Sequence, residues 1–116
     1  LTEDTLKNQR WVSNFKELET KVDFLLIYGS ILRFPKEAQD IDILGVTHKN
    51  NFLEIEKSLK LIQKTQIKKI HALHFTPLEF KKELEKQNKV FIDALEKGII
   101  LFGQEKFIKF IRELRK

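Results

Sequence analysis

Two aspartates separated by one isoleucine stand in an otherwise apolar run, the segment DIDILGV at residues 40–46. If this segment is a strand, Asp40 and Asp42 project from the same face, about 6–7 Å apart along the chain. Two carboxylates at the edge of a core repel each other and lose hydration unless a cation lies between them. Mg²⁺ binds carboxylate oxygens together with waters and phosphate groups, so the pair predicts a magnesium site that a nucleotide completes.

A Gly-Ser pair precedes these aspartates, at the end of another apolar run, residues 22–28. The absence of a side chain lets the backbone of Gly29 approach a ligand, and the loop amides and the Ser30 hydroxyl can donate hydrogen bonds to phosphate oxygens. A helix beginning at Ile31 would add the positive end of its dipole, and Arg33 offers a forked donor. We therefore expect Gly29, Ser30 and Arg33 to bind the phosphates of a nucleotide.

The alternation of amphipathic segments and short apolar runs predicts a sheet covered by helices. In the N-terminal segment, apolar residues near helical spacing predict a single helix whose core face is formed by Leu6, Trp11, Phe15 and Leu18. The expected elements, in chain order, are a helix at 2–20, strands at 22–28 and 40–46, a helix at 51–64, a strand at 67–75, one long helix or two abutting helices from 77 to 97, a short strand or extended segment within 98–103, and a last helix.

Two helix starts carry capping signals. Asn51, with Glu54 three residues later, has the pattern of a capping box, in which each residue satisfies an exposed amide of the other. The segment TPLE at residues 76–79 has the same pattern and adds proline at the first helical position. These signals predict where the second and third major helices begin.

The segments GSILRF at 29–34 and DIDILGV at 40–46 together resemble the signature of the DNA polymerase beta-like nucleotidyltransferase superfamily, in which a Gly-Ser pair precedes a paired-acid strand at this spacing. The resemblance is strongest to the minimal nucleotidyltransferases of bacteria and archaea. It covers nearly all of the chain and includes the ending ALEKGIILFG at 94–103. It implies one nucleotidyltransferase-like domain over residues 1–116, with an α/β (α+β) nucleotidyltransferase fold in which helices pack a mixed β-sheet.

The resemblance also implies an activity. Members of the family transfer a nucleoside monophosphate from a nucleoside triphosphate, here expected to be ATP, to an acceptor hydroxyl and release pyrophosphate. Asp40 and Asp42 would be the catalytic residues and would hold Mg²⁺, in a site for one or two ions, while Gly29 and Ser30 would bind the triphosphate. Members of this size often act beside a small helical partner protein of the HEPN type, sometimes as an antitoxin, and such a partner is expected here as well.

The sequence departs from the family pattern at several positions. Phe34 stands where a glycine often follows the arginine, and Gln39 where a serine often precedes the first aspartate. The family's third carboxylate, expected on the third strand, has no acidic counterpart within residues 67–75. His71 lies near that position and His74 faces the other way; an imidazole can bind a metal or accept a proton, but a strand histidine satisfied by a hydrogen bond is the favoured interpretation. The alternative function is therefore a degenerate nucleotidyltransferase-fold module that binds nucleotide or a HEPN-type partner without efficient turnover.

Charge and composition limit the remaining possibilities. The net charge of +5 favours contact with polyanions, and the last helix carries a basic stripe formed by Lys106, Lys109, Arg112 and Arg115. Because 17 acidic residues are interleaved with the basic ones, a solvated surface is favoured over a nucleic-acid-binding face, which stays a third hypothesis. The chain has no cysteine and no apolar run near the roughly 18 residues of a membrane span, so we expect a cytoplasmic protein without disulfides or a membrane segment.

Overall fold

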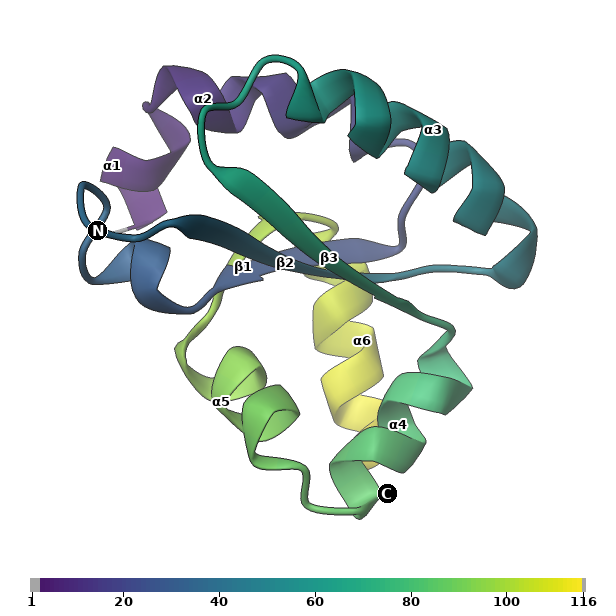
Figure 1. The fold of residues 1–116 in the computed structure, drawn as a ribbon. Coiled ribbons are helices and arrows are strands. Elements are labelled where there is room, and N and C mark those ends of the chain that lie inside the picture. Colours follow the sequence, from purple (N-terminus) through teal and green to yellow (C-terminus); the bar gives the residue numbers. More distant parts are fainter. Residues whose placement is uncertain (1–2, 116) are drawn as a thin grey trace.

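A computed structural model describes residues 3–115 and places a mixed four-stranded sheet at the centre of the molecule (Figure 1). The strands are β1 (Phe24–Tyr28), β2 (Asp40–Val46), β3 (Lys69–Phe75) and β4 (Ile99–Phe102). They follow the order β3-β2-β1-β4, with β1 antiparallel to both of its neighbours and β2 parallel to β3. The expectation of an α/β fold with a mixed sheet packed by helices is confirmed.

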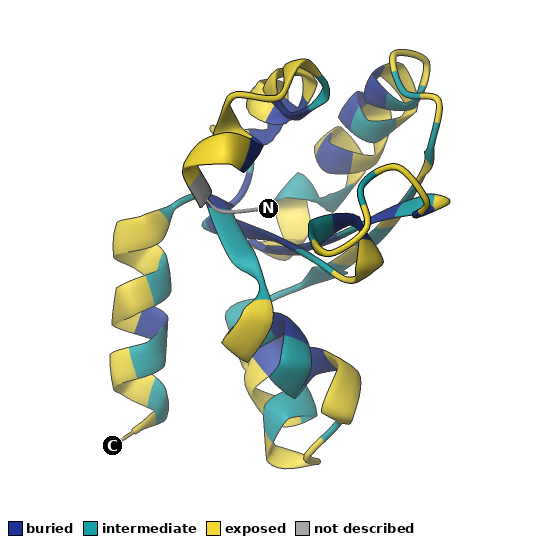
Figure 2. Ribbon diagram, turned by 90° about the vertical axis from the view of Figure 1, so that its left-hand side faces the viewer, coloured by how far each residue is buried: buried dark blue, intermediate teal, exposed yellow. Residues whose placement is uncertain are grey.

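Helices cover both faces of the sheet. The elements on one face are α1 (Glu3–Lys7), α2 (Arg10–Ser13), the 3₁₀ helix η1 (Asn14–Leu18) and α3 (Phe52–Gln63), and those on the other are α4 (Pro77–Glu85), α5 (Lys89–Lys97) and α6 (Gln104–Leu114). The central strands are largely buried, whereas the outer helix surfaces are exposed (Figure 2). Within residues 3–115, no helix has both the length and the apolar character needed to cross a membrane.

The alternation of side chains along β1 divides the hydrophobic core in two. Leu25 and Ile27 belong to the cluster beneath α1, α2 and α3, and Phe24 and Leu26 belong to a second, Phe-rich cluster beneath α4, α5 and α6. Because β1 is a central strand, helices cover both of its faces, and its side chains contribute to both clusters. The same alternation in β2 decides which helices the two aspartates face.

The expected single helix over residues 2–20 is wrong. Residues 3–18 form α1, α2 and η1 in succession, and residue 2 lies outside the described part of the chain. Leu6 and Val12 are both buried, yet six positions on a continuous helix would set them about 120° apart around its axis. Gln9 takes an extended conformation with ψ of 136°, and this break lets both side chains reach the core. Trp11 packs partly buried against the same core, as predicted.

The capping box expected at Asn51 is also wrong. The Asn51 side chain accepts no hydrogen bond from a backbone amide of α3. Instead, its Nδ2 donates hydrogen bonds to Lys21 O and to Thr47 Oγ1, both at 3.3 Å. A one-turn 3₁₀ helix, η3 (Lys49–Asn51), leads into α3. A tertiary hydrogen-bond partner therefore replaces the local cap that the sequence pattern predicts.

The helices after β3 begin and end close to the predicted positions. In α4 the capping box is complete, with Glu79 N donating to Thr76 Oγ1 at 3.1 Å and Thr76 N donating to Glu79 Oε1 at 2.9 Å. The sequence left one long helix or two open, and the structure has two, because Gln87 takes a φ of 57° and Asn88 caps the start of α5. Gly98 follows the end of α5, as predicted.

Candidate functional site

Asp40 and Asp42 lie on the face of β2 that α4, α5 and α6 cover. Ile41 and Ile43 enter the opposite core cluster, whereas Leu44, farther along the aspartate face, belongs to the Phe-rich cluster. The two carboxylate side chains are 41% and 26% exposed, so solvent or a ligand can reach both. The aspartates thus share one face at the start of the strand, as the alternation predicts.

His71 joins the two aspartates from the neighbouring strand. It is the register partner of Asp42, and its Nδ1 lies 3.5 Å from Asp42 Oδ1 and 3.9 Å from Asp40 Oδ2. Oxygens of both carboxylates therefore point toward the same side and converge near one atom. The imidazole is an exposed side chain on β3, the strand on which the family resemblance predicts a third acid.

The carboxylate pair has an unfavourable electrostatic environment. Desolvation by burial raises the pKa of Asp42 above its usual range, and the charge of Asp40 raises it further, while His71 lowers it. Among the side chains of residues 4–115, the only ion-pair partner of either carboxylate is this histidine, and no lysine or arginine lies within 4 Å. Such a pair gains from an additional cation, because a positive charge favours the ionised form of both acids.

Gly29 brings the turn after β1 directly against Asp42. Its backbone has φ of 86° and ψ of −165°, a combination that residues with a side chain rarely adopt. A Cβ atom at this position would overlap Asp42 Oδ2 and lie 3.3 Å from Asp42 Cγ. Glycine therefore allows the turn and the second aspartate to share the same space.

Ser30 and Arg33 follow on the same turn, and both are exposed. The helix expected to begin at Ile31 is only a 3₁₀ turn, η2 (Ser30–Leu32), in which Arg33 N donates to Ser30 O at 3.0 Å. A single turn aligns few peptide dipoles, so the predicted dipole contribution is small. The Ser30 hydroxyl and the Arg33 guanidinium stay available as donors for an anionic ligand.

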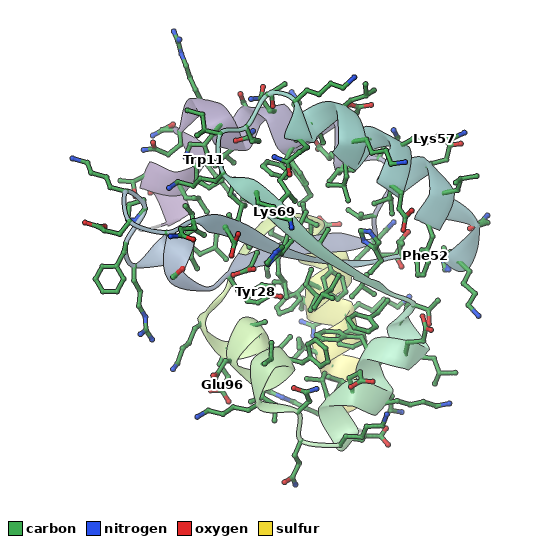
Figure 3. All side chains as sticks on the ribbon, in the orientation of Figure 1. Trp11, Tyr28, Phe52, Lys57, Lys69 and Glu96 are labelled. Atoms are coloured by element: carbon green, nitrogen blue, oxygen red, sulfur yellow. The ribbon has the colours of Figure 1, made fainter. Side chains whose placement is uncertain are left out.

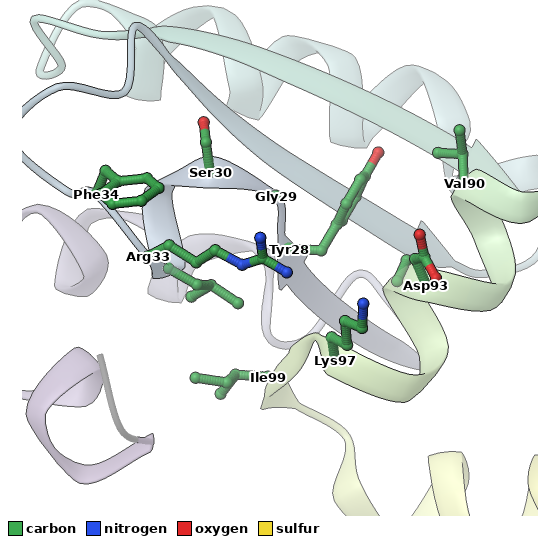
Figure 4. Close-up of a pocket in the computed structure, with 11 residues that line it drawn as sticks. Tyr28, Gly29, Ser30, Arg33, Phe34, Val90, Asp93, Lys97 and Ile99 are labelled. Atoms are coloured by element: carbon green, nitrogen blue, oxygen red, sulfur yellow. The ribbon is translucent and has the colours of Figure 1, made fainter.

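A cavity of about 750 Å³ opens beside this turn, between the end of β1 and α5 (Figure 4). Its polar side chains are Tyr28, Ser30, Arg33, Asp93 and Lys97, and Phe34 and apolar side chains from η2, α5 and β4 complete the wall. The volume lies within the usual range for small-molecule pockets. Neither aspartate of β2 lines it.

Tyr28 and Gly29 connect the cavity to the aspartates. Both residues line the cavity, and Tyr28 is the register partner of Asp42 across the β1–β2 pair. Burial raises the pKa of the Tyr28 phenol, and the negative charge of Asp42 raises it further. The cavity and the carboxylate pair are therefore adjacent parts of one region, on opposite sides of the Tyr28–Gly29 segment.

The contribution of α5 was not predicted from the sequence. No role was expected for Asp93, Tyr28 or Lys97, all of which line the cavity. The sequence does contain a pattern that could have indicated this face of α5. The helical spacing of Val90, Asp93 and Lys97 puts all three on one side of the helix. What the spacing alone does not indicate is that this face meets the end of β1.

His74 and the basic stripe of α6 lie outside this region. His74 points to the other face of the sheet, where its ring centroid lies 5.9 Å from that of Phe52, and desolvation lowers its pKa. No member of the basic stripe lines the cavity beside Tyr28, and Lys106 lies 3.8 Å from Asp23 in an ion pair.

The donor atoms at the aspartates suit a hard divalent cation. Carboxylate oxygens are preferred ligands of Mg²⁺, which also keeps several waters or substrate phosphates in its shell. In the part of the chain that the structure describes, no group of three or more His, Cys, Asp or Glu side chains forms a metal site. The two carboxylates fit a site that a ligand has to complete, and they do not form a closed protein cage.

No model of a known protein family matches the sequence, and no curated protein matches it. Among solved structures, the chain is similar to a crystal structure of the toxin–antitoxin MntA–HpeT, determined for a mutant form. The sequence identity is 13% and the TM-score is 0.48, over 99% of this chain and 88% of that chain.

Proposed function

We propose that the chain is a metal-dependent nucleotidyltransferase that transfers a nucleoside monophosphate from a nucleoside triphosphate, preferentially ATP, to an acceptor hydroxyl and releases pyrophosphate. The observation that carries this proposal is the contact between Gly29 and the Asp42 carboxylate. It sets a turn with phosphate-binding donors against a pair of carboxylates that gain from a divalent cation.

The residues divide the work between metal and phosphate binding. Asp40 and Asp42 would hold Mg²⁺, and Gly29, Ser30 and Arg33 would bind the triphosphate. Bound Mg²⁺ would supply charge neutralisation and alignment of the attacking and leaving oxygens. The protein itself contributes positioning, because Ser30 and Arg33 lie on a turn that is fixed against β2 through Gly29.

His71 supports a second candidate function, a module that binds nucleotide without efficient turnover. It lies against both aspartates, where the resemblance to nucleotidyltransferases leads us to expect a third carboxylate. A neutral imidazole brings no negative charge to a second metal ion and activates an acceptor hydroxyl less strongly than a metal-bound carboxylate site does. We therefore expect slow or undetectable turnover for the isolated chain.

The partner remains part of the proposal on the strength of the sequence resemblance. A small helical HEPN-type protein would supply the acceptor hydroxyl or be masked by binding. Nucleic acid is the less favoured ligand, because the basic stripe of α6 lies away from the cavity.

The test is to incubate the protein with Mg²⁺ and ATP labelled at the α-phosphate in lysate of the source organism, and to identify what becomes labelled. The matched control is the Asp40→Asn, Asp42→Asn variant, which removes both charges but keeps the side-chain size. Labelling of a protein or nucleotide by the wild type alone supports the transferase. If nothing is labelled but Mg²⁺ and ATP together raise the melting temperature more than either alone, the binding module is supported. If neither effect depends on the aspartates, both functions are refuted.

A further inference from the structure

We infer that Lys97, on α5, binds the terminal phosphates of the nucleoside triphosphate from the wall of the cavity opposite Arg33, and so makes the site selective for triphosphates. This inference rests on the proposed function, because it assigns a further residue to the same nucleotide site. Lys97 belongs to neither the Gly-Ser segment nor the aspartate strand, and lies more than fifty residues after both in the sequence.

The positions of the cationic groups support this assignment. Arg33 comes from the turn after β1 and Lys97 from the last turn of α5, and both line the same cavity. In Figure 4 the guanidinium and the ammonium group extend into this space from opposite sides. Among the side chains of residues 4–115, neither has an ion-pair partner, so each keeps its donors for a ligand.

Asp93 does not neutralise Lys97, although it precedes Lys97 by four positions on α5. Such a spacing commonly gives an ion pair on a helix surface. Here no ion pair joins them, and both side chains line the cavity. Two cations and one carboxylate leave a net positive charge, which favours an anion over a neutral occupant.

The position of Gly29 indicates which part of the nucleotide reaches Lys97. Gly29 lies against Asp42 and lines the cavity, and Ser30 and Arg33, which follow it in the chain, line the same cavity. A phosphate that shares a cation with the aspartates has to lie near Gly29, so the rest of the chain of phosphates continues past Ser30 and Arg33. Lys97 faces this path from the other wall and is placed to contact its far end.

The main alternative occupant of this space is the nucleobase, since Tyr28, Leu32 and Ile99 add apolar surface to the lining. A neutral base could stack on the ring of Tyr28, but it would gain little from the two cations at the same cavity, whereas a polyphosphate is attracted by both. The two occupants can be distinguished by measurement, because inorganic tripolyphosphate has no base and binds only if the cavity accepts the phosphates.

The experiment compares the binding of ATP, AMP and inorganic tripolyphosphate, each with Mg²⁺, by isothermal titration calorimetry. The Lys97→Ala variant is set against Lys89→Ala, which removes the same charge from the first turn of α5 at an exposed position that does not line the cavity. Loss of one charge-assisted hydrogen bond is expected to weaken ATP and tripolyphosphate binding roughly tenfold, with AMP changed less than about twofold. Lys97→Arg should retain most of the affinity for ATP and tripolyphosphate. Asp93→Asn should strengthen the binding of both, because it removes a negative charge from the cavity.

The outcomes separate this inference from the proposed function. If the wild type binds ATP and Lys97→Ala behaves like Lys89→Ala, the role of Lys97 is refuted while the nucleotide site stands. A loss of AMP affinity as large as that of ATP, with tripolyphosphate unchanged, would assign the cavity to the base and also refute it. If the wild type binds neither ATP nor tripolyphosphate, both proposals fail. Circular dichroism spectra and melting temperatures of the variants check that the substitutions leave the fold intact.

Discussion

Replacing Gly29 by alanine is expected to strain the turn after β1 and to displace the Asp42 carboxylate. The backbone at this position, with φ of 86° and ψ of −165°, lies in a region that is essentially restricted to glycine. The added methyl group would also overlap Asp42 Oδ2, the end of a side chain that can rotate away. Stability and metal binding are therefore affected for different reasons.

The backbone strain should account for most of the loss of stability. A residue held in such a conformation costs about 1–3 kcal/mol, which corresponds to a fall of roughly 4–12 °C in melting temperature for a domain of this size. Rotation of the Asp42 side chain relieves the overlap at little further cost. It also moves one carboxylate away from the shared cation, so the Gly29→Ala variant should lose the combined response to Mg²⁺ and ATP even below its melting temperature.

Gly45, on β2, provides a matched control. A Cβ atom there would lie 3.5 Å from Leu25 Cδ1 and from Val22 Cγ1, which is ordinary contact, and its φ is not positive. Gly45→Ala should leave stability unchanged or raise it by about 0.4–1 kcal/mol. Urea unfolding of both variants, alone and in an Asp42→Ala background, separates strain from overlap. Equal unfolding free energies for Gly29→Ala and Gly45→Ala, with an unchanged Mg²⁺ and ATP response in both, would refute this account of the turn.

Three further substitutions test the site and the fold. His71→Asp adds a third carboxylate beside Asp40 and Asp42, so it should lower the melting temperature in EDTA. Mg²⁺ should then raise the melting temperature of this variant more than that of the wild type. An equal increase in both proteins would argue against a cation at this position. Burial lowers the pKa of His74 below its ordinary value of 6.5, so the stability that this neutral imidazole contributes is present above pH 6.5 and is lost as the pH falls through the lowered pKa. His74→Gln should remove that acid-side loss in urea titrations at several pH values, and an unaltered pH profile would contradict the assignment. Thr76→Ala should lower the free energy of unfolding by about 1 kcal/mol, since it removes the cap of α4, and a change below the error of the measurement would count against the cap.

The parts of the fold that depend on local pattern could be predicted from the sequence. The apolar run with two aspartates gives β2 its observed bounds, and the TPLE segment gives the start of α4. The N-terminal segment was predicted as one helix because its apolar residues recur near helical spacing, and no glycine or proline marks the break at Gln9. Asn51 has a capping pattern but donates its amide to partners that are distant in sequence, and no local rule indicates that choice.

The candidate site could likewise be predicted only in part from the sequence. Alternation along each strand predicts that Asp40 and Asp42 share a face and that His71 and His74 face opposite ways, and the family resemblance adds that His71 lies near the position of a third acid. The cavity depends on how α5 packs beside the turn after β1, a long-range arrangement that the sequence pattern does not specify. Lys97 therefore enters the account only when the structure brings its helix next to Arg33. Lys69, labelled with Tyr28 in Figure 3, is likewise the register partner of Asp40 only through the pairing of β2 with β3.

The most direct test of the central claim measures whether a divalent cation is shared between Asp40, Asp42 and a triphosphate. Mn²⁺ replaces Mg²⁺ as a hard cation that electron paramagnetic resonance detects. After equilibrium dialysis, the wild type should retain more Mn²⁺ with a non-hydrolysable ATP analogue than without it, and the Asp40→Asn, Asp42→Asn variant should lose that increase. Equal retention by both proteins in the presence of the analogue would contradict the claim that these carboxylates and the nucleotide bind one ion together.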